Sequence, residues 1–221
     1  MILKPKKLPY WGFNVPAPIL CWILKRRFNK LVINSIDLKP NCSYLLLSNH
    51  IGFWDGFWGA YLCYKLMDKR VPLRAFFAMS LKKQLEKNQW LRYFGCFSVS
   101  PFGKSREESI DFAAKILNKP GNILLFYPQG NLESNYVRQI ELREGIAEIL
   151  AKTNENCQII WTSNLIEYFE SLKASVYFHM LDCGTNVNFN IDELSQKIND
   201  HHQKSIQKQF RFTTEVETKR A

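Results

Sequence analysis

Residues 43–68, SYLLLSNHIGFWDGFWGAYLCYKLMD, place a short apolar run directly in front of a longer one. Residues 43–49 are almost wholly apolar, which is typical of a strand that is covered on both faces. Residues 55–68 are rich in aromatic and aliphatic side chains over a length that suits a buried helix. A strand that leads straight into a helix is the repeating unit of α/β domains. The polar residues at the junction, His50 and Asp55, are the first candidates for chemistry.

The same alternation of strand and helix continues along the chain. Predicted strands occupy 73–79, 96–99, 123–127, 157–162 and 174–181, and predicted helices occupy 81–94, 105–118, 137–153 and 191–210. Ser105 and Glu108 have the spacing of a capping box at the start of one of these helices. The pattern predicts an α/β fold in which a mostly parallel, mixed sheet is flanked by helices. Because ligands of such sheets gather beyond the carboxyl ends of strands, residues 48–50 and 127–130 are expected to share one edge.

Composition bounds the class of protein. A chain of 221 residues suits one domain, and 46% hydrophobic with 23% charged residues excludes wholesale disorder. The net charge of +10 favours anionic partners, namely nucleic acid, an acidic membrane surface or phosphate-bearing small molecules. The six cysteines form no CxxC pair and no close cluster with histidine, so neither a zinc site nor a disulfide framework is predicted.

Residues 1–34 are expected to form an amphipathic, basic and aromatic segment ahead of a single α/β domain at 35–221. Residues 4–19, KPKKLPYWGFNVPAPI, mix lysine, proline and aromatic side chains, and the apolar run at 17–24 ends in the basic residues 25–27. No apolar run reaches the ~18–20 residues that cross a bilayer. The segment either faces an anionic membrane surface or packs on the domain as an arm. We expect a cytoplasmic protein, peripheral on the inner face of the cytoplasmic membrane.

His50 and Asp55 form a pair only in one local geometry. On a regular helix, five steps would set the two side chains about 140° apart. They meet if His50 lies in the turn after the strand and Asp55 begins the helix. Asp55 would then fix the imidazole tautomer, and the other ring nitrogen would accept a proton from a hydroxyl. The alternative is a histidine on the rim of the domain that caps the helix, with Asp55 at the helix N-terminus and no catalysis.

A pair of this kind lacks a protein nucleophile. The chain has no G-x-S-x-G motif, and neither serine nor cysteine adjoins the pair. The nucleophile is therefore expected to be a substrate alcohol, and the electrophile an acyl group activated as a thioester. Such a reaction needs a base and an oxyanion stabiliser and requires no metal.

Three blocks in order resemble the glycerolipid acyltransferase family, typified by lysophosphatidic acid acyltransferase. They are N-H-x4-D at Asn49–Asp55, GCFSVSP at 95–101 and FYPQG at 126–130. The family carries N-H-x4-D, G-x-x-F-I-x-R and F-P-E-G-T-R-S. The resemblance extends from about Tyr44 to Thr162 and includes ELREG at 141–145, which is similar to the family's basic-x-Gly helix start. The first block is the specific one.

The resemblance implies an enzyme similar to 1-acylglycerol-3-phosphate acyltransferase. His50 would be the general base and Asp55 its charge partner. They would serve acyl transfer from acyl-CoA or acyl carrier protein to a hydroxyl of a lysophospholipid or related glycerolipid. No cofactor or metal is implied beyond the acyl donor. The candidate substrate-binding residues are Asn49, Gln129, Gly130, Ser134, Lys104 and Arg106.

The sequence departs from the family where cations are expected. The second block ends in Ser100 and Pro101 instead of an arginine, so Lys104 and Arg106 replace that arginine only if the loop bends back. Gln129 stands at the family's glutamate, and Asn131-Leu132 stand at its Thr-Arg. The expected Val-Pro after the last helix is Ile160-Trp161. A different lysolipid or a non-phosphorylated alcohol therefore fits as acceptor equally well.

Other features of the sequence have structural or non-catalytic interpretations. The aromatic residues Phe53, Trp54, Phe57, Trp58 and Tyr61 either line an acyl tunnel or form core, and core is favoured. His201 and His202 are expected at the surface of a polar helix. A lipid-binding relative without turnover remains an alternative. So does a basic nucleic-acid module, although nucleic acid is not the expected partner because the chain lacks RNP, zinc-finger and helix-turn-helix motifs.

Overall fold

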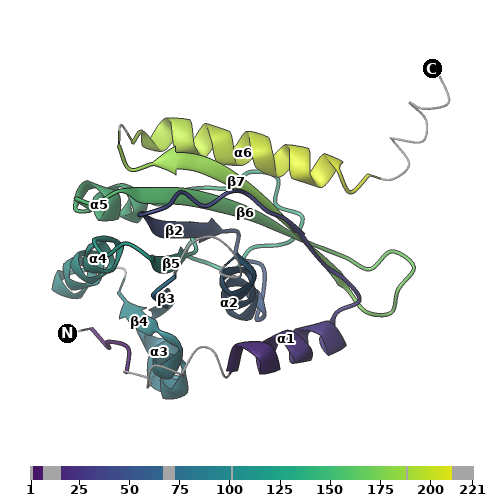
Figure 1. Ribbon diagram of the computed structural model, residues 1–221, viewed down its shortest axis with the longest axis horizontal. Helices are drawn as coiled ribbons and strands as arrows, with labels where there is room; N and C mark the ends of the chain where they lie inside the picture. The colour runs from purple at the N-terminus through teal and green to yellow at the C-terminus, as the bar shows by residue number, and fades with distance from the viewer. Residues whose placement is uncertain (1, 7–15, 67–72, 101, 188, 211–221) are drawn as a thin grey trace.

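The computed structural model describes residues 2–6, 16–66, 73–100, 102–187 and 189–210. They contain a seven-stranded sheet with the order β1-β7-β6-β2-β5-β3-β4 (Figure 1). The strands are β1 (Leu31–Asn34), β2 (Ser43–Ser48), β3 (Ala75–Leu81), β4 (Cys96–Val99), β5 (Asn122–Phe126), β6 (Cys157–Glu167) and β7 (Ser175–Thr185). The β6–β7 pair is antiparallel and all other pairs are parallel. The predicted mixed, mostly parallel sheet is confirmed.

Strand β2 lies in the middle of the sheet, and all of its residues are buried. Because side chains alternate across a strand, Tyr44 and Leu46 enter one core cluster, whereas Leu45 and Leu47 enter the other. A continuous apolar run is what a strand covered on both faces requires.

Helices cover both faces of the sheet (Figure 1). The helical elements are α1 (Pro16–Arg27), α2 (Asp55–Leu66), α3 (Lys82–Lys87), the 3-10 helix η1 (Gln89–Phe94), α4 (Lys104–Leu117), α5 (Gly145–Ala151) and α6 (Ile191–Gln207). The cluster that contains Leu46 also holds apolar residues of α1 and α2. The cluster that contains Leu47 holds those of α4, α5 and α6. The α1/α2 face and the α6 face are therefore opposite sides of one sheet.

Two predicted helices differ from the structure in the extent of their helical backbone. The helix predicted at 137–153 begins only at Gly145. Before it, the backbone N–H and C=O of Ile140 bond to the Asn199 side chain of α6, at 2.7 and 3.0 Å. The helix predicted at 81–94 divides into α3 and η1 at Asn88, whose non-helical backbone (φ of −122° and ψ of 62°) interrupts the helix.

The predicted capping box of α4 is wrong. Gly103 precedes the helix with no side-chain cap. The Ser105 hydroxyl instead donates to Ser100, and the Glu108 carboxylate accepts from the backbone N–H of Ile2 at 3.1 Å. The backbone at the start of residues 2–6 therefore binds the carboxylate that the sequence spacing assigned to the helix cap.

The prediction of a surface position for His202 is also wrong. Its side chain is buried between α6 and the sheet. Nδ1 lies 3.0 Å from Ser163 Oγ, and Nε2 lies 3.1 Å from the carbonyl of Val137. Polar partners on both sides make burial of this ring tolerable.

The described residues within 1–34 contribute directly to the fold. Leu31–Asn34 forms β1 at the edge of the sheet, inside the range grouped with the N-terminal segment, and pairs with β7. Helix α1 buries Cys21 and Leu24 against the core while Trp22 is exposed. Residues 7–15 of the aromatic and basic stretch lie outside the described residues. In the described part of the chain, no helix combines the length and the apolar character that crossing a membrane demands.

Candidate active site

The carboxyl end of β2 is fastened to β6 by Asn49. This side chain is buried, its Nδ2 donates to the Asn164 carbonyl at 2.9 Å, and its Oδ1 accepts from the Asn164 N–H at 2.7 Å. The Asn164 amide in turn donates to Ser48 Oγ at 2.9 Å. Asn49 thus has both amide atoms engaged with backbone and sets where the next residue, His50, leaves the sheet.

His50 and Asp55 meet in the geometry that the sequence permitted. His50 lies in the turn before α2, Asp55 is the first residue of α2, and His50 Nδ1 lies 2.6 Å from Asp55 Oδ2. The same carboxylate oxygen accepts from the backbone N–H groups of Ile51 at 2.7 Å and Gly52 at 2.9 Å. An ionised carboxylate only accepts, so the bond assigns the ring proton to Nδ1 and leaves Nε2 unprotonated in the neutral ring.

The two partners differ in their access to solvent. The Asp55 side chain is 0% exposed, whereas the His50 side chain is 27% exposed. A fully buried carboxylate therefore orients a ring that is itself partly exposed to solvent.

Tyr127, directly after β5, forms one wall of the site. Its ring stacks on His50 with the centroids 4.3 Å apart and the planes 20° apart. Burial raises the pKa of Tyr127 well above its ordinary value, and the Asp55 carboxylate adds to the rise. The phenol therefore stays neutral, and its role toward the imidazole is packing. Sequence reasoning gave Tyr127 no role, since nothing in the motif distinguished it from its neighbours.

The segment after β5 wraps around the backbone of His50. Gln129 is buried, and its Oε1 accepts from the His50 N–H at 2.9 Å. The N–H of Glu133 donates to the His50 carbonyl at 2.7 Å. Gln129 is one of the predicted substrate-binding residues. In the structure, its side chain instead binds the main chain of His50.

Gly130 brings an unassigned arginine into the site. With φ of 72°, Gly130 adopts the left-handed conformation that glycine takes without steric cost. A Cβ added there would lie 2.6 Å from Arg143 Cζ, so the guanidinium lies against the glycine backbone. Arg143 belongs to the ELREG stretch, and its basic character was the only signal in the sequence that pointed to it.

Three predicted substrate-binding residues have other surroundings. Arg106 forms a two-pronged ion pair with Glu148, which links α4 to α5, raises the pKa of Arg106 and lowers that of Glu148. Ser134 is exposed, and its Oγ accepts from the Tyr136 N–H at 3.1 Å. Lys104 is exposed at the start of α4. The structure thus does not bring these three side chains into hydrogen-bonding contact with His50 among the described residues.

The aromatic residues around α2 divide between core and surface. Trp58 and Tyr61 are buried in the core cluster on the α1/α2 face. Phe53 is 76% exposed, and its ring meets Trp54 edge to face at 5.5 Å between centroids. The expectation of core holds for the inner residues, and apolar surface remains close to His50.

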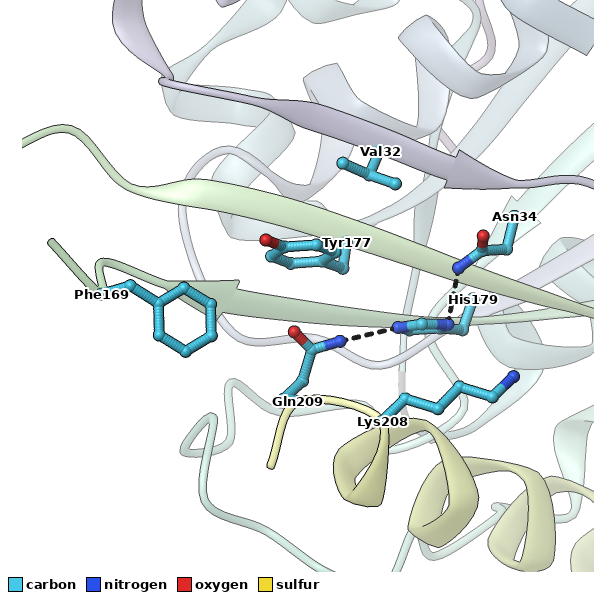
Figure 2. Close-up of a pocket in the computed structure, with 7 residues that line it drawn as sticks. All are labelled: Val32, Asn34, Phe169, Tyr177, His179, Lys208 and Gln209. Carbon is cyan, nitrogen blue, oxygen red and sulfur yellow. Dashed lines mark hydrogen bonds between the residues drawn. The ribbon is translucent and has the colours of Figure 1, made fainter. Parts of the chain in front are cut away.

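A hollow of about 300 Å³ lies elsewhere, between the sheet edge and the end of α6 (Figure 2). It is lined by Val32, Asn34, Phe169, Tyr177, His179, Lys208 and Gln209. Phe178 enters the core on the α1/α2 face, so its neighbour His179 points to the α6 face, away from α2. The described residues contain no group of three or more metal-ligating side chains.

Comparison with known proteins supports the fold. No protein-family model and no curated protein sequence matches the chain. Among solved structures, the chain is similar to the crystal structure of the 1-acyl-sn-glycerophosphate (LPA) acyltransferase PlsC from Thermotoga maritima. The TM-score is 0.56 at 13% identity, over 90% of this chain and 80% of that chain. The fold is acyltransferase-like.

Proposed function

We propose that this protein is an O-acyltransferase of lipid metabolism. It would transfer a fatty acyl group from acyl-CoA or acyl carrier protein to a hydroxyl of a lysophospholipid or related glycerolipid. The observation that carries the proposal is the contact of 2.6 Å between His50 Nδ1 and buried Asp55, with the ring partly exposed at the carboxyl edge of the sheet. The acyltransferase-like fold supports it.

In the proposed mechanism, His50 acts directly on the acceptor. Nε2 accepts the hydroxyl proton while the acceptor oxygen attacks the thioester carbonyl and forms the new C–O bond. The tetrahedral intermediate then collapses, the C–S bond breaks, and the departing thiolate takes the proton back from Nε2. Asp55 stabilises the imidazolium that exists between these two steps.

The cysteines favour this direct transfer over a covalent acyl-enzyme. A thiol reacts as its thiolate, and burial raises the pKa of both Cys96 and Cys157 to about 12. The pKa values of Cys21, Cys42, Cys63 and Cys183 are raised as well, mainly by burial. These thiols are therefore poor nucleophiles near neutral pH.

Replacement of His50 by alanine tests the proposal. With labelled acyl-CoA and a panel of lysolipids, His50→Ala is expected to lower transfer by roughly 10²- to 10⁴-fold, because the base is lost. Its thermal midpoint should change little, since the ring is partly exposed. His201→Gln, on the α6 face, is the matched control and should keep full activity.

Two results would redirect the interpretation. Undiminished transfer by His50→Ala would refute the mechanism. Binding of acyl-CoA by the unaltered protein, without transfer to any acceptor, would instead favour a lipid-binding relative that lacks turnover.

We also propose that the protein works on an anionic membrane surface at the cytoplasmic face. Helix α1 exposes Ile19, Trp22 and Ile23, and its last turn carries the basic residues 25–27. Apolar side chains beside cations suit the interface of an anionic bilayer, where both acyl chains and lysolipids are found.

A further inference from the structure

Arg143 is a cation held at the proposed active site without a carboxylate partner. Its guanidinium lies against the backbone of Gly130, and the backbone N–H of Arg143 donates to the Pro128 carbonyl at 3.2 Å. Gln129, which lies between Pro128 and Gly130 in the sequence, accepts a hydrogen bond from the His50 backbone N–H through its side-chain oxygen. Arg143 is therefore attached on both sides to the segment that wraps around His50.

The guanidinium is available to a ligand. Arg143 is exposed, and none of the carboxylates in the described part of the chain forms an ion pair with it. The Asn131 amide, oriented with its oxygen toward Arg143, accepts from Nη2 at 3.1 Å and leaves the other donors free. Arg106 differs in this respect, because Glu148 occupies its guanidinium.

We propose that Arg143 binds a phosphate group of a substrate during acyl transfer, an inference that rests on the proposed function. A planar guanidinium presents paired N–H donors that match phosphate oxygens. Glycine at position 130 is part of the arrangement, since a Cβ there would displace the guanidinium. The phosphate belongs either to the acceptor headgroup or to the coenzyme A of the donor.

The test compares Arg143→Gln and Arg143→Lys with the unaltered protein. Arg74→Gln is the matched control. Arg74 is exposed just before β3, at the amino ends of the parallel strands, whereas His50 lies at their carboxyl ends. Each protein is assayed with lysophosphatidic acid and with monoacylglycerol of the same chain length. Each acceptor is paired with acyl-CoA and with the phosphate-free acyl thioester of N-acetylcysteamine.

Arg143→Gln is expected to lower kcat/KM about 10- to 100-fold, the loss that follows removal of a charge-assisted hydrogen bond. If the acceptor phosphate is bound, the loss occurs with lysophosphatidic acid and is absent with monoacylglycerol. If the coenzyme is bound, the loss occurs with acyl-CoA and is absent with the short thioester. Arg143→Lys should lose less, since it keeps the charge, and Arg74→Gln should lose nothing.

An equal loss with all four substrate pairs, or no loss with any, would overturn the inference. Calorimetric binding of glycerol 3-phosphate and of coenzyme A to the same proteins separates this inference from the proposed function. If the unaltered protein shows no turnover, the proposed function fails, yet weaker binding of either ligand to Arg143→Gln still supports Arg143. Equal affinity in both proteins, or no binding to either, contradicts it.

Discussion

One oxygen of Asp55 accepts three hydrogen bonds, from the His50 ring and from the backbone of Ile51 and Gly52. The other oxygen is buried and has no hydrogen-bond partner among the described residues. A single atom thus fixes the ring, the turn before α2 and the start of α2. Both the proposed proton transfer by His50 and the local backbone conformation therefore depend on this one oxygen atom.

Asp55→Asn is expected to lower acyl transfer by at least ~10²-fold, because a neutral amide no longer holds the Nδ1–H tautomer or stabilises the imidazolium. Its free energy of unfolding should fall by about 1–3 kcal/mol, since two backbone donors lose a charged acceptor. Steady-state kinetics and chemical denaturation measure the two effects. Unchanged activity would contradict the assigned role.

Tyr127→Phe tests the claim that this residue acts by packing. The hydroxyl is buried and, in the described part of the chain, has no hydrogen-bond partner. Its removal should therefore leave the free energy of unfolding unchanged or raise it by about 1 kcal/mol, with activity retained. Tyr127→Ala should lose about 3–5 kcal/mol as the stacked ring disappears. A large loss in Tyr127→Phe, measured by denaturation, would show that the hydroxyl has a partner.

Gly130→Ala should act on the site through Arg143. The new Cβ must displace the guanidinium, and φ of 72° adds about 1–2 kcal/mol of backbone strain. We expect the phosphate-dependent loss of kcat/KM to match that of Arg143→Gln. In a double-mutant cycle, the alanine should cause little further loss once Arg143 is already glutamine.

At the scale of elements, α1 has two faces with different partners. Ala17, Cys21 and Leu24 face the core, whereas Ile19 and Trp22 are exposed. The Arg26 guanidinium lies 4.8 Å from the centroid of the Trp22 ring, which groups aromatic and basic character on the outer face. An element that is anchored on one side and exposes apolar side chains on the other supports the proposed contact with a bilayer.

The triple variant Ile19→Ser, Trp22→Ser and Ile23→Ser is expected to sediment with anionic vesicles about tenfold less, or less still, than the unaltered protein. The reason is that each exposed apolar side chain contributes on the order of 1 kcal/mol to membrane binding. The thermal midpoint should not fall, because these side chains are exposed. Leu172→Ser serves as control, as Leu172 is fully exposed outside α1. Equal sedimentation of all three proteins would exclude this face.

At the scale of the whole molecule, buried histidines connect the sheet with α6, through His202 and Ser163, and with the residues that follow α6, through His179. His179 Nδ1 lies 2.8 Å from Asn34 and its Nε2 lies 3.0 Å from Gln209 (Figure 2). Burial is the main cause that lowers the pKa of His179 to about 4, and it also lowers that of His202. The folded protein therefore favours the neutral rings.

Stability should fall as the solution becomes acidic. The unfolded chain binds protons at histidine from about pH 6.5 downward, whereas folded His179 resists protonation until about pH 4. The stabilisation is thus complete above pH 6.5 and is lost progressively as the pH falls to 4. At pH 5 the loss from His179 alone is on the order of 2 kcal/mol. Denaturation of the protein and of His179→Asn across this range measures it, and parallel pH profiles would contradict the assignment.

The local parts of this protein were readable in its sequence. Strand β2, helix α2 and the His50–Asp55 contact arise within one short stretch, because an apolar run, a turn and a helix start depend on neighbouring residues. The alternation of strands and helices predicted the mixed sheet for the same reason. The edge strand β1 escaped prediction because its four residues carry little pattern.

Only the tertiary structure decided what surrounds that contact. Asn49 meets Asn164 across 115 residues and Gln129 meets His50 across 79, since the sheet order places β5 and β6 on either side of β2. The same packing pairs Arg106 with Glu148 in an ion pair and places the Arg143 guanidinium against Gly130. Spacing along the chain determines local geometry, but which distant cation reaches a site depends on how the strands pair and where each helix begins.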